Sequence, residues 1–125
     1  MKNKIESSLA PEAIGPYSQA IEANGFVFVS GQLPINRDTG KMPISVGEQT
    51  RQSLTNIKYI LMGAGCDMDD IVKTTVLLND IEDFGKMNEV YASFFDKDAP
   101  ARACYQVAAI PKGALVEIEA IAVKK

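Results

Sequence analysis

The spacing of apolar residues changes along the chain, and each change marks an expected element. Residues 18–31 read SQAIEANGFVFVSG, two β-forming runs on either side of Asn24-Gly25. This dipeptide predicts a hairpin, because the tight turn between two such strands needs positive φ at both positions. Residues 33–43 contain two prolines, an aspartate and a glycine without periodicity, and are expected to form a loop.

A helix is expected over residues 46–63. Ser45 and Glu48 have the spacing of a capping box and stand just before the first apolar residue. The apolar positions that follow at helical spacing are Val46, Thr50, Leu54, Ile57 and Leu61. The run Gly63-Ala64-Gly65 ends the pattern.

A second helix is expected between two β-forming runs. Residues 71–79 are β-branched and short, as in a strand. Asp80 or Asp83 can cap the helix that follows, and Ala99-Pro100 ends it. The apolar face of this helix is expected to comprise Phe84, Met87, Tyr91, Phe94 and Phe95.

The order of elements predicts one α+β domain covering residues 1–125. Strands over residues 101–108 and 115–123 are expected to form a hairpin through the turn IPKGA, and an extra strand could occupy residues 3–8. The order ββ, α, β, α, ββ is typical of a mixed sheet with both helices on one face. A partner subunit is then the simplest cover for the other face.

Composition narrows the classes of function. Thirteen Lys and Arg against sixteen Asp and Glu give a net charge of -3, and the basic residues are scattered, which argues against nucleic-acid binding. No apolar run approaches the roughly 18 residues of a membrane span, and no apolar segment follows the charged N-terminus. We therefore expect a cytoplasmic protein without membrane contact.

Cysteine and histidine usage points in the same direction. Cys66 and Cys104 are interpreted as free thiols of a reducing compartment. The chain has no histidine, which removes the commonest metal ligand and the commonest general base. We expect neither a metal site nor a Ser-His-Asp triad, and no cofactor.

The last two expected strands bring charged residues together. If they pair so that partner numbers sum to an odd value near 221, Arg102 and Cys104 share a face with Glu117 and Glu119. A slip by one residue would instead place Arg102 opposite Ala120. The first register is favoured, because it buries the apolar row of the final strand on the helix side.

This grouping has two interpretations. Arg102 and a glutamate can form a plain cross-strand salt bridge. Alternatively, the planar fork of Arg102 holds a substrate carboxylate while Glu117 positions or deprotonates water. Cys104 is interpreted as a small core residue whose backbone matters more than its thiol, because no histidine is present to activate it.

Other candidates have open local interpretations. Gly31, after Ser30, either makes a turn or lets a ligand approach the backbone. Tyr17 follows Gly15-Pro16 in a loop, as a surface cover or as a hydroxyl aimed into a pocket. Asn88 on the second helix lies next to its apolar stripe.

Several separated strings, in order, resemble the RidA (YjgF) family along nearly the whole chain. They are APEAIGPYSQAI, FVFVSGQLPI, DFGKMNEVYASFF, PARACYQV and IPKGALVEIEAIAV. The segment FFDKDAPARAC is shorter than in some members, a difference expected at the rim of the family's ligand cleft. Gly113 stands where other members carry a charged residue.

The resemblance implies a chorismate-mutase-like α+β subunit that forms a homotrimer with clefts between subunits. It implies that Arg102 clamps the carboxylate of a 2-imino acid and that Glu117 positions the attacking water. It also implies that Tyr17, Ser30, Gly31, Asn88 and Cys104 line the cleft.

The function so implied is 2-iminobutanoate/2-iminopropanoate deamination. Reactive 2-aminoacrylate and 2-aminocrotonate, released by pyridoxal-phosphate dehydratases, would be hydrolysed to 2-keto acids and ammonia. Two alternatives are a module that binds or senses 2-keto acids through Arg102, and an endoribonuclease that lowers translation. The acidic net charge and the missing histidine weigh against the ribonuclease.

Overall fold

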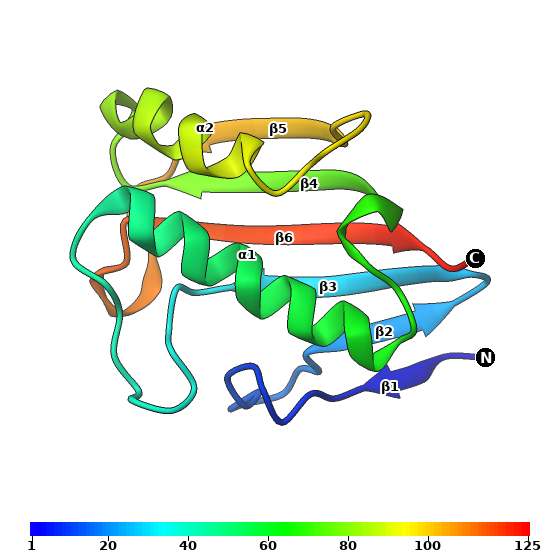
Figure 1. Ribbon diagram of the computed structural model, residues 1–125. Coiled ribbons are helices and arrows are strands. Elements are labelled where there is room, and N and C mark those ends of the chain that lie inside the picture. Colours follow the sequence, from blue (N-terminus) through cyan, green and yellow to red (C-terminus); the bar gives the residue numbers. More distant parts are fainter.

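The computed structural model describes residues 1–125 and places six strands in one sheet with two α-helices on one side (Figure 1). In sequence order the main elements are β1 (Asn3–Ile5), β2 (Ala20–Ala23), β3 (Phe26–Gln32), α1 (Val46–Gly63), β4 (Ile71–Leu78), α2 (Phe84–Ala92), β5 (Ala101–Gln106) and β6 (Val116–Val123). The spatial order of the strands is β1-β2-β3-β6-β4-β5. The α+β class and both helices on one face are confirmed.

The predicted hairpin is β2 and β3. Asn24 has φ 51° and Gly25 has φ 80°, the two positive values that a tight hairpin turn requires. The extra strand near the N-terminus is present as β1, which pairs antiparallel with β2.

Helix α1 has the predicted bounds. The side-chain oxygen of Ser45 accepts a hydrogen bond from the backbone N–H of Glu48 at 3.2 Å, so the Ser45 half of the expected capping box is formed. The Glu48 carboxylate pairs with Arg51 instead of closing the box. Helix α2 is shorter than its apolar pattern indicates: it ends at Ala92, before Phe94 and Phe95. Of the two predicted caps, Asp83 makes no side-chain hydrogen bond, and Asp80 caps only the short 3-10 turn before α2.

The predicted hairpin of the last two strands is wrong. Strand β4 lies between them, parallel to β5 and antiparallel to β6. Helix α2 is the crossover that parallel neighbours such as β4 and β5 require. The composition of the two strands explains the order, since β6 buries a continuous apolar row and suits the centre of the sheet, whereas β5 carries no fully buried residue and suits an edge.

The two faces of the sheet differ sharply. One packs under the helices in a core that includes Leu54, Ile57 and Ile118, all without exposed surface. The opposite face carries no helix and leaves large apolar side chains open. Phe26, Phe28, Tyr105 and Val123 are between 38% and 50% exposed. We call this surface the open face.

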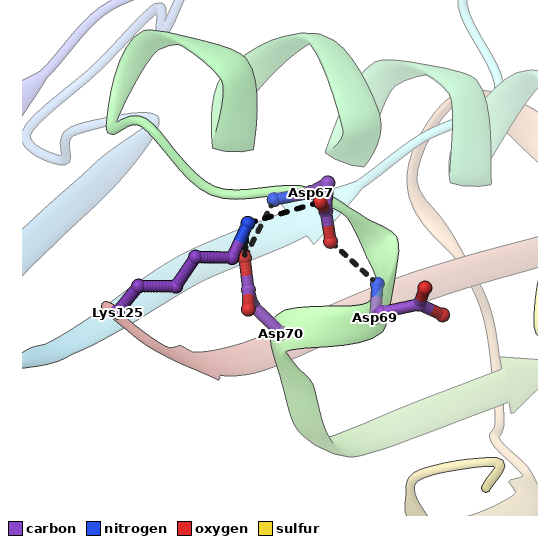
Figure 2. A network of polar contacts seen from close by, with 4 residues as sticks. All are labelled: Asp67, Asp69, Asp70 and Lys125. Atoms are coloured by element: carbon purple, nitrogen blue, oxygen red, sulfur yellow. Dashed lines mark hydrogen bonds and ion pairs between the residues drawn. The ribbon is translucent and has the colours of Figure 1, made fainter. Parts of the chain in front are cut away.

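An ion-pair network holds Lys125, two residues beyond the end of β6. The Nζ of Lys125 lies 3.2 Å from Asp67 and 3.5 Å from Asp70, two residues whose side chains also cap the 3-10 turn Met68–Asp70 (Figure 2). The hydrogen bond with Lys125 lowers the pKa of Asp67, and the same bond raises the pKa of Lys125. The network ties the end of β6 to the start of β4, although such exposed pairs add little stability.

Candidate functional site

The predicted site residues form two clusters on opposite faces of the sheet. In the ladder, Arg102 stands beside Thr74, which is buried under the helices, whereas Glu117 stands beside Leu77 on the open face. Paired residues share a face. The expectation that Arg102 and Cys104 share a face with Glu117 and Glu119 is therefore wrong within one chain, because it assumed a β5–β6 pairing that β4 prevents.

The arginine cluster comprises Phe84, Asn88, Tyr91, Arg102 and Cys104. The Nη1 of Arg102 donates a hydrogen bond to Oδ1 of Asn88 at 2.7 Å. Its Cζ lies 4.7 Å from the centre of the Tyr91 ring and 5.4 Å from that of Phe84. Three side chains from one stripe of α2 thus hold a half-buried guanidinium at the edge strand.

The guanidinium of Arg102 has no counter-ion in the chain. The five ion pairs of the structure involve Lys4, Arg51, Lys124 and Lys125, and none involves Arg102. The plain salt bridge is therefore absent. A guanidinium has five N–H donors, so most of them are free to hold an anion from outside the chain.

Cys104 lies half-buried in the same row as Arg102. Burial raises the pKa of the thiol, and the nearby positive charge of Arg102 offsets only part of this effect. The thiol is therefore protonated at neutral pH, which does not suit a nucleophile.

The bulge cluster comprises Tyr17, Ser30, Gly31 and Glu117. Val29 pairs with Ala120 and Gln32 pairs with Ile118, so Ser30 and Gly31 together oppose a single residue of β6. This is a β-bulge, a device that re-aims strand residues beside a site. It also corrects the interpretation of Gly31 as a turn residue, because β3 continues to Gln32.

The bulge cluster lines one open cavity of about 920 Å³, large enough for a small metabolite. The hydroxyl of Ser30 donates to the carbonyl of Ser18 at 2.6 Å, which leaves its lone pairs to accept a hydrogen bond. Tyr17 is 54% exposed at the rim.

Glu117 is a half-buried residue that lines this cavity. Burial raises its pKa above the ordinary glutamate value, and the neighbouring charge of Glu119 raises it further. A carboxylate with a raised pKa is a stronger base than a free glutamate, which suits the activation of water.

Gly31 leaves the space that the Glu117 carboxyl occupies. A Cβ at position 31 would stand 2.7 Å from Oε2 and 3.1 Å from Cδ of Glu117. The obstacle is the end of a flexible side chain, so an added methyl group would displace the carboxyl rather than break the sheet.

If Glu117 has the catalytic role that the family resemblance implies, Gly31→Ala is expected to fold with a melting temperature close to that of the parent and to lose turnover. A displacement of about 1 Å at a catalytic group can lower the rate about 100-fold. Gly47→Ala in α1 is the control, because the added Cβ would lie at an ordinary 3.5 Å from the side chain of Val90 in α2. Steady-state kinetics and thermal melts of both variants check this, and full activity of Gly31→Ala would contradict the assigned position of Glu117.

The residues that hold the two clusters in place could not be recognised from the sequence pattern. Phe84 and Tyr91 appeared only as an apolar stripe, although their spacing with Asn88 places all three on one side of α2. Gln19 was also missed. Its buried side chain accepts from the N–H of Ser7 and donates to the carbonyl of Pro11, which holds the loop before Tyr17.

Some kinds of site find no support in the residues present. No group of three or more His, Cys, Asp or Glu side chains lies close enough to hold a metal ion. Neither helix is long and apolar enough to cross a membrane.

Fold and site together define a class: small α+β proteins in which an unpaired arginine and a bulge-supported glutamate face opposite sides of one sheet. The family described as Endoribonuclease L-PSP matches residues 7–124. The chain therefore belongs to this family, also called the RidA (YjgF) family.

Full-length relatives agree in sequence and structure. A mouse protein named 2-iminobutanoate/2-iminopropanoate deaminase is 49% identical over 125 residues, covering 99% of this chain and 93% of its own. The crystal structure of Escherichia coli TdcF with bound serine has a TM-score of 0.95 at 47% identity, covering 98% and 99% of the two chains. The Escherichia coli YjgF structure has a TM-score of 0.95 at 44% identity with the same coverage.

Proposed function

We propose that this protein hydrolyses reactive 2-imino acids, formed from 2-aminoacrylate and 2-aminocrotonate, to 2-keto acids and ammonia. The observation that carries the proposal is the half-buried guanidinium of Arg102, held by α2 without a counter-ion. It presents a planar fork that fits a carboxylate. The name of the mouse relative and the serine in the TdcF structure support a small carboxylate substrate of this kind.

The complete site is proposed to lie between subunits. Arg102, Asn88 and Cys104 stand on the helix side, whereas Tyr17, Ser30, Gly31 and Glu117 stand on the open side. One sheet separates the two clusters, so a small substrate meets both only if a second copy brings its bulge cluster to the arginine cluster of the first. A homotrimer closed through the open faces would repeat this contact three times and cover the exposed apolar residues.

The mass in solution tests this assembly. We expect light scattering coupled to gel filtration to give three times the 13.5 kDa chain mass at micromolar concentration. Phe28→Glu places a charge on the open face and should shift the mass toward the monomer and abolish turnover. A monomeric parent protein with full activity would contradict the shared site.

The proposed chemistry needs only the residues of the two clusters. The substrate carboxylate binds the Arg102 fork, and Glu117 takes a proton from a water molecule as the water oxygen attacks the C=N carbon. Glu117 returns this proton to the adduct nitrogen, and the proton of the adduct hydroxyl passes to the same nitrogen. The C–N bond then breaks, so that ammonia leaves as the C=O bond of the 2-keto acid forms. Free imines already hydrolyse in water, so orientation and electrostatic stabilisation suffice for useful acceleration and no cofactor is required.

The supply of substrate links the protein to other enzymes. Its substrates are short-lived products of pyridoxal-phosphate dehydratases that act on serine and threonine, so we place it alongside those enzymes in the cytoplasm. The two free cysteines fit a reducing compartment.

A coupled assay tests the activity. A purified threonine dehydratase generates the imine, whose absorbance is followed with and without the protein. We expect the wild-type protein to accelerate the decay and Arg102→Ala to abolish the acceleration. If the wild-type protein binds 2-ketobutyrate in calorimetry but leaves the decay unchanged, it is a sensor of 2-keto acids and not a deaminase.

A further inference from the structure

We propose that Tyr91 is a positioning residue, which acts through Arg102 and fixes the plane of its guanidinium before a carboxylate arrives. The inference deepens the proposed function and depends on Arg102 as the carboxylate anchor. Tyr91 itself does not touch the substrate.

The first support is the geometry of the stack. The Cζ of Arg102 lies 4.7 Å from the centre of the Tyr91 ring, within the range of a cation–π contact. Tyr91 is only 5% exposed, whereas Phe84, the other ring beside the guanidinium, is 39% exposed. Tyr91 is thus the buried floor on which the guanidinium rests.

The second support is the anchor of the ring. The hydroxyl of Tyr91 lies 2.7 Å from Oγ1 of Thr74, and Thr74 is 1% exposed. Thr74 is also the ladder partner of Arg102 across the β4–β5 pair. Thr74 is therefore paired with Arg102 through the backbone and bonded to Tyr91 through its side chain. The contacts among Arg102, Thr74 and Tyr91 form a closed loop beside the guanidinium.

Two further contacts restrict the motion of the Tyr91 ring and of the guanidinium. Phe95 packs against Tyr91 with ring centres 5.0 Å apart, which limits tilting of the ring. Asn88 accepts from Nη1 of Arg102 and limits rotation of the guanidinium in its plane. An arginine ordered in this way loses little side-chain entropy when it binds, which is the advantage of preorganisation.

The ring supports the cation without neutralising it. Burial raises the pKa of Tyr91, so its phenol stays protonated and uncharged at neutral pH. A leucine would fill only part of the same space, would neither attract the guanidinium nor bond to Thr74, and would leave the buried hydroxyl of Thr74 unpaired.

Three variants separate the parts of this arrangement. Tyr91→Phe and Thr74→Val each break the hydroxyl bond from one end and keep the ring, and Tyr91→Leu removes the ring. Thr50→Val is the matched control, because it removes a fully buried hydroxyl that bonds only to the carbonyl of Val46 in α1.

Calorimetry with pyruvate and the coupled assay give the readouts. We expect Tyr91→Leu to raise the Kd for pyruvate and the KM for imine about tenfold, with kcat within about twofold. Tyr91→Phe and Thr74→Val should raise both constants about threefold. Thr50→Val should lower the melting temperature without changing either constant. A merely structural Tyr91 would instead behave like Thr50, with lower stability and unchanged affinity.

A spectroscopic signature supplements the affinities. In the NMR spectrum, the ring current of Tyr91 should shift the side-chain N–H protons of Arg102 upfield in the wild-type protein and in Tyr91→Phe, and the shift should vanish in Tyr91→Leu. If Tyr91→Leu does not fold, Tyr91→Phe and Thr74→Val decide the matter. Wild-type pyruvate affinity in the folded variants would overturn the positioning role.

Pyruvate binding by Arg102→Lys distinguishes a failure of the proposed function from a failure of the positioning role. If Arg102→Lys binds pyruvate as tightly as the parent protein, Arg102 is not the carboxylate anchor and the proposed function falls with it. If Arg102→Lys weakens binding while the Tyr91 and Thr74 variants bind normally, only the positioning role is wrong.

Discussion

Arg102→Lys should weaken the binding of pyruvate and 2-ketobutyrate about 30-fold, although it keeps the positive charge. Hydrogen bonds to charged groups contribute about 1.5–3 kcal/mol, and lysine loses the second arm of a two-pronged contact. It also loses the flat surface that contacts the rings of Phe84 and Tyr91. Calorimetric titration measures the Kd directly.

Arg51→Lys is the matched control for this substitution. Arg51 is an exposed residue of α1 whose partner is Glu48, and its replacement should leave the Kd unchanged. Equal affinities for Arg102→Lys and the parent protein would show that the unpaired guanidinium does not bind the carboxylate.

Glu117→Gln should still bind 2-keto acids but turn over imine about 100-fold more slowly. General base catalysis contributes about 100- to 10,000-fold, and glutamine keeps the size of the side chain without its basicity. KM or Kd should change little, so the loss should appear in kcat. Glu89→Gln, on the exposed surface of α2, is the control. Wild-type turnover by Glu117→Gln would remove the catalytic role of this carboxylate.

Stability and pH dependence give an independent check on Glu117. Because its folded-state pKa is raised, the protonated form favours folding, and this stabilisation is lost as pH rises through the folded-state pKa. Glu117→Gln should therefore unfold at the same or a higher temperature at neutral pH. The activity of the parent protein should fall as the pH drops, with a midpoint above the ordinary glutamate pKa of about 4.3.

Much of the fold follows from local pattern. Asn24-Gly25 and the cap at Ser45 each use side-chain and backbone chemistry within a few residues, so the hairpin and the bounds of α1 could be predicted. The pairing of the last two strands could not. The connection between β5 and β6, residues 107–115, is compatible with a hairpin, and only the competition of β4 for the same ladder positions decides against it.

The site shows the same limit. Arg102 and Glu117 can be selected from the alternation within their own strands, but their faces depend on the strand that separates them. Tyr17, Ser30 and Asn88 have only open local interpretations, and the resemblance to a family is what assigns them to the cleft. Tyr91 escaped notice because a buried aromatic on an apolar stripe is expected of any helix, and its contact with Arg102 exists only after β5 docks on β4.

The position of β6 has a consequence for how the chain is made. The strand is the last in sequence, yet it lies between β3 and β4 and joins the two halves of the sheet, with Lys125 pinned back to Asp67 (Figures 1 and 2). A growing polypeptide emerging from the ribosome can form the first hairpin and α1, but it has no continuous sheet until residue 123 is free to pair with Phe26. Contacts across such a sequence distance make folding slow. The nascent chain therefore exposes its unpaired strands until translation has passed β6.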